Sequence, residues 1–185
     1  VIVEPTRKRV LWIGRGRARE DIRPFFDLLG KAGCDAIEAV VMDMNAAFEQ
    51  EVRARCRKAR IVYDLFHVVA KYSREVIDRV RVDEANRLRA DPRGRRVVKT
   101  ARWLLLRNRD TLTEEQEIDL DELLAANRTL LIVYLLKDDL KALWRYRHSG
   151  YAKRFWRRWL RRAMRSGIAP LRTFAQRLKP YLSGI

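Results

Sequence analysis

Over residues 1–64, short apolar runs alternate with segments of helical periodicity. The residues after Asp64 show helical periodicity alone. The apolar runs are VIV at 1–3, RVLWIG at 9–14, IEAVVM at 37–42 and RIVY at 60–63. The first two runs flank a turn-like segment and therefore predict a β-hairpin. Helices are expected at 19–33 and 45–56. A few strands followed by a long series of helices predict a mostly helical α+β fold.

The helical part begins after Asp64 and predicts a second domain. Its first helix should cover residues 64–81, with apolar residues near helical spacing at Phe66, Val69, Ile77 and Val80. The segment ADPRG at 90–94 interrupts the pattern, as proline and glycine do. Further helices are expected at 95–108, 114–126, 129–146, 149–166 and 169–179. We therefore expect two domains, residues 1–64 and residues 65–185.

The composition is that of a folded protein, because 48% of the residues are hydrophobic and 35% are charged. The longest apolar run, LLIVYLL at 130–136, is too short to cross a bilayer. The chain opens on apolar residues followed by charges, so we expect no signal peptide. Cys34 and Cys56 have no neighbouring cysteine or histidine at a metal-binding spacing, which is typical of reduced thiols. These features predict a cytoplasmic protein that does not contact a membrane.

Positive charge is concentrated in the last quarter of the chain. The formal net charge is +17, and residues 141–185 carry 13 basic residues and no acidic one. Such an excess favours a surface that faces a polyanion. The alternative is a basic face that is only solvated.

The helix expected at 149–166 separates its apolar and basic residues into two faces. One face consists of Ala152, Phe155, Trp156, Trp159, Leu160, Ala163 and Met164. The other consists of Lys153, Arg154, Arg157, Arg158, Arg161, Arg162 and Arg165. We expect the tryptophans to pack in the core and the basic face to bind nucleic-acid phosphates. A helix that lies on a membrane surface has the same pattern, and this is the weaker alternative.

Two apolar runs end on a carboxylate. Asp43 follows the run at 37–42, and Asp64 follows the run at 60–63. A carboxylate in this place either caps the next helix or binds a positive group; Asn45 is a second candidate for the cap. His67 follows Asp64 at Asp-x-x-His spacing, one helical turn away, where it could orient Asp64 or join the outer shell of a metal site. A histidine packed in the core is the alternative.

Several segments resemble, in their residues and in their order along the chain, the DDE transposases of bacterial insertion sequences, in particular the ISL-three family. The resembling segments are RVLWIGRGR, RPFFDLLG, IEAVVMDMNAAFEQEV, ARIVYDLFHVVAKYSREVIDRVR, KTARWLLLRNRDTL and LKPYLSGI. They cover nearly the whole chain. The resemblance implies DNA transposition by metal-dependent strand cleavage and transfer, with transposon ends and target DNA as partners.

The resemblance also implies a ribonuclease-H-like fold in which three carboxylates hold two divalent ions, Mg²⁺ or Mn²⁺. Two such ions stabilise the attacking and the leaving oxygen of a phosphodiester. Asp43 matches the second acid of the triad and is the metal ligand expected here. Asp64 and His67 match the Asp-x-x-His signature of several transposase families and are the other catalytic candidates. The helices from about residue 64 onward match the insertion between the second and third acids.

The resemblance places the first acid before VIV and the third after LKPYLSGI. We therefore expect an internal fragment that binds DNA but is inactive alone and does not hold the metal stably. Its strands should form a three- or four-stranded remnant of the family's sheet. The alternative is a nucleic-acid-binding or dimerising protein that modulates an intact transposase, with a homo-oligomer or that transposase as partner.

Overall fold

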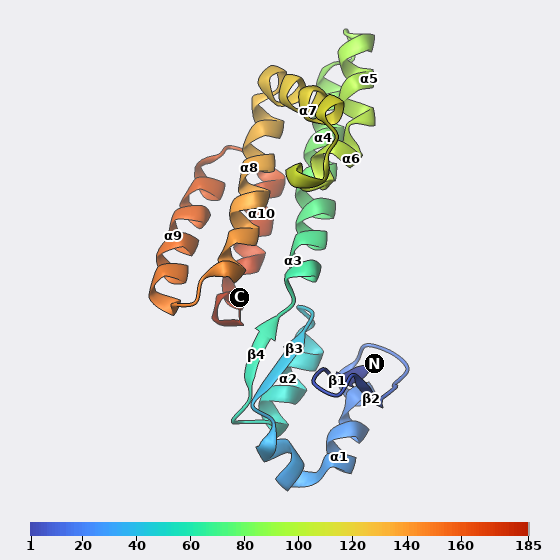
Figure 1. Cartoon of the computed structure of the whole chain (residues 1–185), viewed down its shortest axis with the longest axis vertical. Helices are drawn as coiled ribbons and strands as arrows, with labels where there is room; N and C mark the ends of the chain where they lie inside the picture. The colour runs from blue at the N-terminus through green and yellow to red at the C-terminus, as the bar shows by residue number, and fades with distance from the viewer. Residues whose placement is uncertain (185) are drawn as a thin grey trace. The chain divides into compact units, whose positions relative to one another are not determined.

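A computed structural model describes residues 1–184. Their contacts divide them into two compact units, which are described separately below. Within the described residues, the first unit contains Val1–Asp64 together with Ser183 and Gly184, and the second contains Leu65–Leu182. The ribbon in Figure 1 shows strands only in the first of these units. The mostly helical α+β fold that the sequence predicts is confirmed.

The strands of the first unit form two separate pairs. They are β1 (Ile2–Glu4), β2 (Arg9–Trp12), β3 (Ala39–Met42) and β4 (Arg60–Tyr63). β1 and β2 form the predicted antiparallel hairpin, and β3 and β4 pair in parallel. The expectation of one three- or four-stranded sheet is wrong for the described residues, because no ladder hydrogen bonds join the hairpin to the parallel pair.

Two helices accompany these strands. They are α1 (Arg19–Ala36) and α2 (Ala46–Arg55), which pack against each other. Gly30 interrupts α1 with a φ of 67°, a conformation that glycine adopts without strain. Along β4 the side chains alternate, so that Ile61 and Tyr63 are buried and Val62 is exposed.

Cys34 of α1 and Cys56, which follows α2, are both buried and free. Burial, together with the smaller effect of the neighbouring Cys34 thiol, raises the pKa of the Cys56 thiol to about 11. A thiol with this pKa is protonated at neutral pH and is therefore a poor nucleophile and metal ligand. The two cysteines contribute to packing between α1 and α2.

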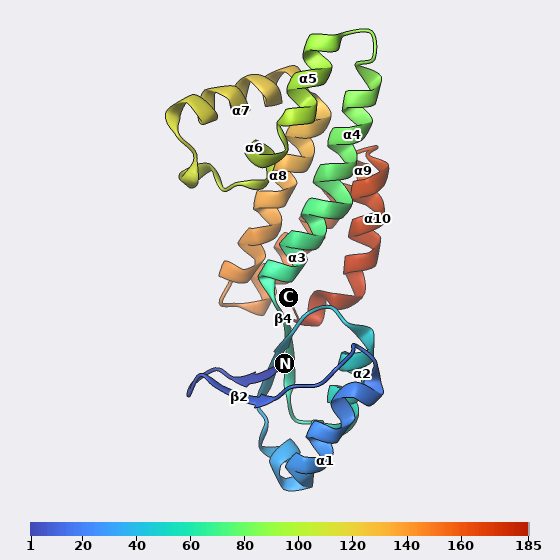
Figure 2. The same ribbon diagram turned by 90° about the vertical axis from the view of Figure 1, so that its right-hand side faces the viewer.

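The second unit is built from helices. They are α3 (Leu65–Tyr72), α4 (Asp78–Arg87), α5 (Pro92–Thr100), α6 (Arg102–Leu106), α7 (Glu114–Ala126), α8 (Arg128–Ala142), α9 (Ser149–Arg165) and α10 (Ala169–Leu178). Short 3₁₀ segments lie at Arg109–Thr111, Leu143–Arg145 and Lys179–Gly184. A π-helical turn, Ser73–Ile77, joins α3 to α4. Figure 2 shows these two helices following one another as a single rod beside α8.

The π-helical turn changes which residues of this rod face the core. A uniform helical repeat places Phe66 on the same face as Ile77 and Val80. Ile77 and Val80 are buried, but Phe66 is 71% exposed, and Val68 is buried instead. The wider π turn shifts the phase of the residues on either side of it, so the predicted apolar face is wrong at Phe66.

The core of the second unit lies between α3, α8, α9 and α10. Tyr72 of α3 is completely buried and donates a hydrogen bond to the carbonyl oxygen of Val133 at 2.8 Å. Its ring meets that of Phe174 of α10 edge to face, with 5.1 Å between the centroids. Trp159 of α9 donates to the carbonyl oxygen of Leu136 at 2.8 Å. These buried polar contacts hold four helices in one arrangement.

Candidate functional site

Asp43 and Asp64 follow neighbouring parallel strands. β3 and β4 pair with Met42 opposite Tyr63, so the next residue on each strand is a carboxylate. The backbone N–H of Asp64 donates to the carbonyl oxygen of Met42 at 2.9 Å, which continues the ladder to this point. Because both strands run in the same direction, their two carboxylates lie at one edge of the sheet. The structure therefore brings together two of the three residues that the sequence singled out.

Asn45, and not Asp43, caps helix α2. The Asn45 side-chain oxygen accepts hydrogen bonds from the backbone N–H groups of Ala47 at 2.9 Å and Phe48 at 3.2 Å. The Asp43 carboxylate is instead 3.0 Å from the guanidinium of Arg17, and its side chain is 25% exposed. Asp43 therefore does not cap α2, which was the main alternative to binding a positive group.

Arg17 is a neighbour of this site that the sequence did not indicate. It lies 26 residues before Asp43, in the loop that precedes α1. The Asn45 side-chain amide donates to the Arg17 carbonyl oxygen at 3.3 Å, which holds the loop beside the end of β3. Gly16 in the same loop has a φ of 101°, a conformation that favours glycine. A loop contact over this sequence distance leaves no periodic pattern that could have predicted it.

His67 lies on α3, in the second unit, and its side chain is exposed rather than packed in the core. Its ring contacts the ring of Phe66 edge to face, with a centroid distance of 5.5 Å. The core-histidine alternative therefore fails. The role of His67 beside Asp64 stays a prediction.

The described residues do not form a complete centre for two divalent ions. Among residues 1–184, no group of three or more His, Cys, Asp or Glu side chains is close enough to hold a metal ion. Asp43 and Asp64 supply oxygen ligands of the kind that Mg²⁺ and Mn²⁺ prefer. However, the Arg17 guanidinium already occupies one oxygen of Asp43. A two-ion centre at this edge would need further ligands.

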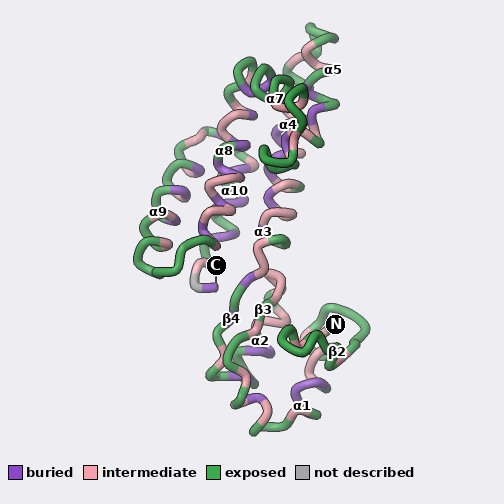
Figure 3. Tube along the Cα trace, viewed as in Figure 1, coloured by how far each residue is buried: buried purple, intermediate pink, exposed green. Residues whose placement is uncertain are grey.

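Helix α9 has the two faces that its sequence predicts. Trp156, Trp159 and Ala163 are buried, and the two indole rings stack with 5.2 Å between their centroids. The tube in Figure 3 shows buried and exposed residues alternating along α9 at helical spacing. The expectation that the tryptophans are core residues is confirmed.

The seven basic residues of α9 are all exposed. Arg162 forms an ion pair with Asp139 of α8, so part of its charge is neutralised. The Arg158 guanidinium lies over the Phe155 ring, 5.2 Å from its centroid. No ion pair with a described residue involves Lys153, Arg154, Arg157, Arg158, Arg161 or Arg165. These six residues, called the α9 basic face below, form a cationic surface available to an anion.

No helix within residues 1–184 is both long and apolar enough to cross a membrane. No solved structure is significantly similar to the chain.

Comparison with known proteins gives matches over the full length of the chain. Residues 1–185 match the ISL3 family of DDE transposases, described as a transposase. The chain is 57% identical, over all of its 185 residues, to the transposase for insertion sequence element IS1001 of Bordetella parapertussis, of which it covers 46%. It is 30% identical over 200 residues to the transposase for insertion sequence element IS1557 of Mycobacterium tuberculosis, a match that covers 97% of this chain and 45% of the relative. The chain thus spans less than half the length of these curated relatives, and it belongs to the ISL3 family of DDE transposases.

Proposed function

We propose that this chain is part of a transposase that cuts and joins DNA strands in a metal-dependent reaction. The unit Val1–Asp64 would contribute to a ribonuclease-H-like catalytic core, and the helices from Leu65 onward would be the domain inserted into that core. The observation that carries the proposal is the pair of carboxylates, Asp43 and Asp64, at one edge of the parallel strands β3 and β4. Membership of a transposase family supports the reaction class.

Asp43 is the residue to which we assign a metal-ligand role. Its carboxylate does not cap α2 and is partly exposed, and Arg17 is the cation that it contacts. The cation of Arg17 beside it indicates that this edge favours positive charge. We assign Asp64 and His67 to the same centre as supporting residues, on the strength of their Asp-x-x-His spacing.

We further propose that residues 1–185 bind DNA without cleaving it when they are present alone. Two carboxylates at the β3–β4 edge are fewer ligands than two divalent ions require. DNA would instead contact the α9 basic face, because Lys and Arg side chains without protein partners gain free energy by releasing counterions from phosphates. We also propose a cytoplasmic location, because the DNA on which a transposase acts lies in that compartment.

A chimeric transposase tests the role of Asp43. Residues 1–185 replace the matching segment of the Bordetella parapertussis relative, and transposition is measured with Asp43 intact and in Asp43→Asn. Loss of a metal-ligand charge should lower transposition by at least roughly a hundredfold, since a catalytic metal contributes several kcal/mol to the transition state. DNA binding should be unchanged.

Glu38→Gln is the matched control, because Glu38 is an exposed carboxylate just before the opposite end of β3. It should transpose like the unsubstituted chimera. Equal activity of Asp43→Asn and Glu38→Gln would remove Asp43 from the catalytic centre. Nicking of plasmid DNA by residues 1–185 alone with Mg²⁺, abolished by Asp43→Ala, would instead overturn the proposal that the chain alone is inactive.

A further inference from the structure

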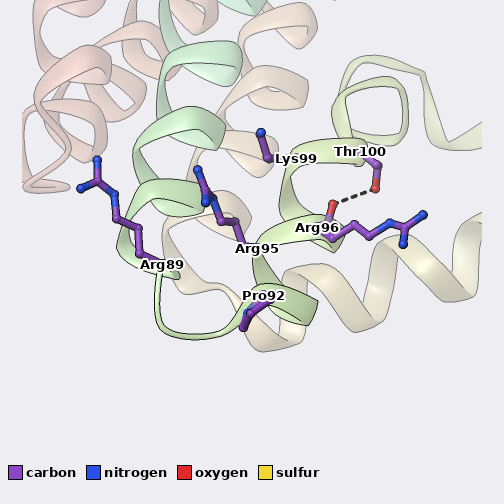
Figure 4. Close-up of a pocket in the computed structure, with 6 residues that line it drawn as sticks. All are labelled: Arg89, Pro92, Arg95, Arg96, Lys99 and Thr100. Atoms are coloured by element: carbon purple, nitrogen blue, oxygen red, sulfur yellow. Dashed lines mark hydrogen bonds between the residues drawn. The ribbon is translucent and has the colours of Figure 1, made fainter.

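A pocket of about 430 Å³ lies on α5 and on the loop that joins it to α4. Its lining contains four cationic side chains and no acidic one: Arg89, Arg95, Arg96 and Lys99, together with Pro92 and Thr100. Figure 4 shows Arg89 across from Arg95, with Lys99 one turn further along α5 and Arg96 extending to the other side. Its volume is in the range of about 300–1,000 Å³ that is typical of pockets for small ligands.

The four cations of this pocket have no acidic partner, whereas several arginines close to them in the sequence do. On α4 Arg79 pairs with Asp83 and Arg87 pairs with Glu84, and on α6 Arg102 pairs with Asp78. Among the described residues no ion pair involves Arg89, Arg95, Arg96 or Lys99. Like charges held around one concave surface repel one another unless an anion lies between them. No carboxylate of the described residues therefore neutralises the positive charge of the pocket.

A hydrogen bond fixes the position of α5, and one buried donor of the pocket has no acceptor in the described part of the chain. Arg81 of α4 donates to the carbonyl oxygen of Lys99 at 2.7 Å, which fixes α5 against α4. The Nε atom of Arg95 is buried and has no hydrogen-bond acceptor among the described residues. The Thr100 hydroxyl donates to the carbonyl oxygen of Arg96 at 3.1 Å, so the free donors of the pocket are the cationic side chains.

We propose that this pocket binds a phosphate of the DNA backbone and is a second DNA contact, separate from the α9 basic face. α5 packs on α4, whereas α9 packs on α8 and α10, and Figures 1 and 2 place α5 at one end of the helical unit, away from α9. The two surfaces therefore bind different phosphates. This inference rests on the proposed DNA-binding function and adds a defined site to it.

The test compares two double variants of the 185-residue chain that remove the same charge. Arg89→Gln with Lys99→Gln removes two exposed cations of the pocket. Arg74→Gln with Arg93→Gln removes two exposed cations that also have no acidic partner among the described residues but lie outside the lining of the pocket. Binding to a labelled DNA duplex is measured over about 50–200 mM salt. The pocket variant should lower the slope of log affinity against log salt by about 1, the contribution of one phosphate, and weaken binding at about 0.1 M salt by roughly tenfold. The control variant should keep a slope close to that of the unsubstituted protein.

The outcomes separate the pocket from the proposed function. Equal slopes for the pocket variant and the control overturn the pocket site, while DNA binding by the unsubstituted chain still stands. Absence of DNA binding by the unsubstituted chain overturns both. A slope change on an RNA duplex that is absent on DNA overturns DNA as the occupant. Arg95→Gln is the second variant; it should lower the slope by about 1, and an unchanged slope in a folded Arg95→Gln protein, checked by circular dichroism, counts against the site.

Discussion

Lys137 shows how tertiary contacts set the pKa of a single buried side chain. Its side chain is completely buried on α8, where the ammonium group donates to the carbonyl oxygens of Leu105 at 2.7 Å and Arg107 at 3.1 Å. It also lies over the ring of Tyr134, 4.2 Å from the centroid. Burial and, to a smaller extent, the nearby charge of Lys141 lower the pKa of Lys137 to about 8, although Asp138 opposes the shift.

This pKa predicts a pH-dependent stability that Lys137→Met removes. The folded state holds the Lys137 proton less tightly than the unfolded state does, so the charged lysine lowers the stability of the protein at pH values below about 8. This loss of stability disappears as the pH rises from about 8 toward the pKa of the lysine in the unfolded chain. The contribution of Lys137 to the free energy of unfolding should therefore rise by about 2 kcal/mol between pH 8 and 9.5. Cys56, whose pKa is raised in the folded state, lowers the stability of both proteins in the same range. Urea unfolding of the unsubstituted protein and of Lys137→Met at both pH values measures this difference.

Lys141→Met is the control for that measurement, because Lys141 is also a lysine of α8 but is only half-buried. It should retain most of the rise with pH. The same rise in Lys137→Met as in the unsubstituted protein would show that another group titrates in this range.

At the scale of single elements, local signals in the sequence were reliable where the element depends on its own residues. The Thr113 hydroxyl accepts from the Gln116 backbone, and the Gln116 side chain accepts from the Thr113 backbone, which is the capping box that Thr-x-x-Gln spacing favours. Helix α7 accordingly begins at Glu114. The two faces of α9 follow from its spacing alone. The phase shift at Ser73–Ile77 was missed, because a π turn differs from an α turn by one hydrogen-bond register rather than by composition.

Helix α9 also carries a prediction about DNA binding. Arg157→Gln with Arg161→Gln removes two residues of the α9 basic face and should reduce the slope of log affinity against log salt by about 2. Arg162→Gln should have a smaller effect per charge, since Asp139 already pairs with Arg162. Fluorescence anisotropy with a labelled duplex over a salt series gives both slopes. A slope that falls equally for each arginine removed, Arg162 included, would mean that the ion pair opens when DNA binds.

At the scale of the whole molecule, each compact unit has its own buried polar anchor. In the unit Val1–Asp64 the anchor is Glu51, which is 1% exposed and forms ion pairs with Arg19, Arg23 and Arg55. Burial alone would raise the pKa of Glu51, but hydrogen bonds from these arginines outweigh it and lower the pKa. The carboxylate thus stays charged and joins α1 to α2. In the unit Leu65–Leu182 the corresponding residue is Lys137.

We expect the two units to respond separately when these anchors are removed. Glu51→Ala leaves three arginines without their shared carboxylate and should destabilise its unit by about 2–4 kcal/mol. Hydrogen exchange of backbone amides should accelerate within residues 1–64 and stay unchanged in α8, α9 and α10. Lys137→Met should change exchange in α8, α9 and α10 and leave residues 1–64 unchanged. Acceleration throughout the chain in both variants would show that residues 1–184 unfold as one cooperative body.

The sequence by itself determined the family, the mostly helical α+β class, the hairpin, the cap at Thr113, and the two faces of α9. Each of these depends on residues within one or two turns or strands of each other, so spacing and residue type are enough to predict it. The order of the segments that resemble transposases is likewise a property of the linear chain.

Only the tertiary structure decided how distant residues meet. It separated the strands into two pairs, brought Arg17 to Asp43, placed Glu51 among three arginines, and left the four cations of the α5 pocket without acidic partners. The sequence contains all of these charges, but the energy of a charge depends on its distance to other charges and on its burial. The position of Asp43 after an apolar strand could be predicted from the sequence. Only the tertiary structure showed that Asn45 caps α2 in its place and that Asp43 contacts Arg17.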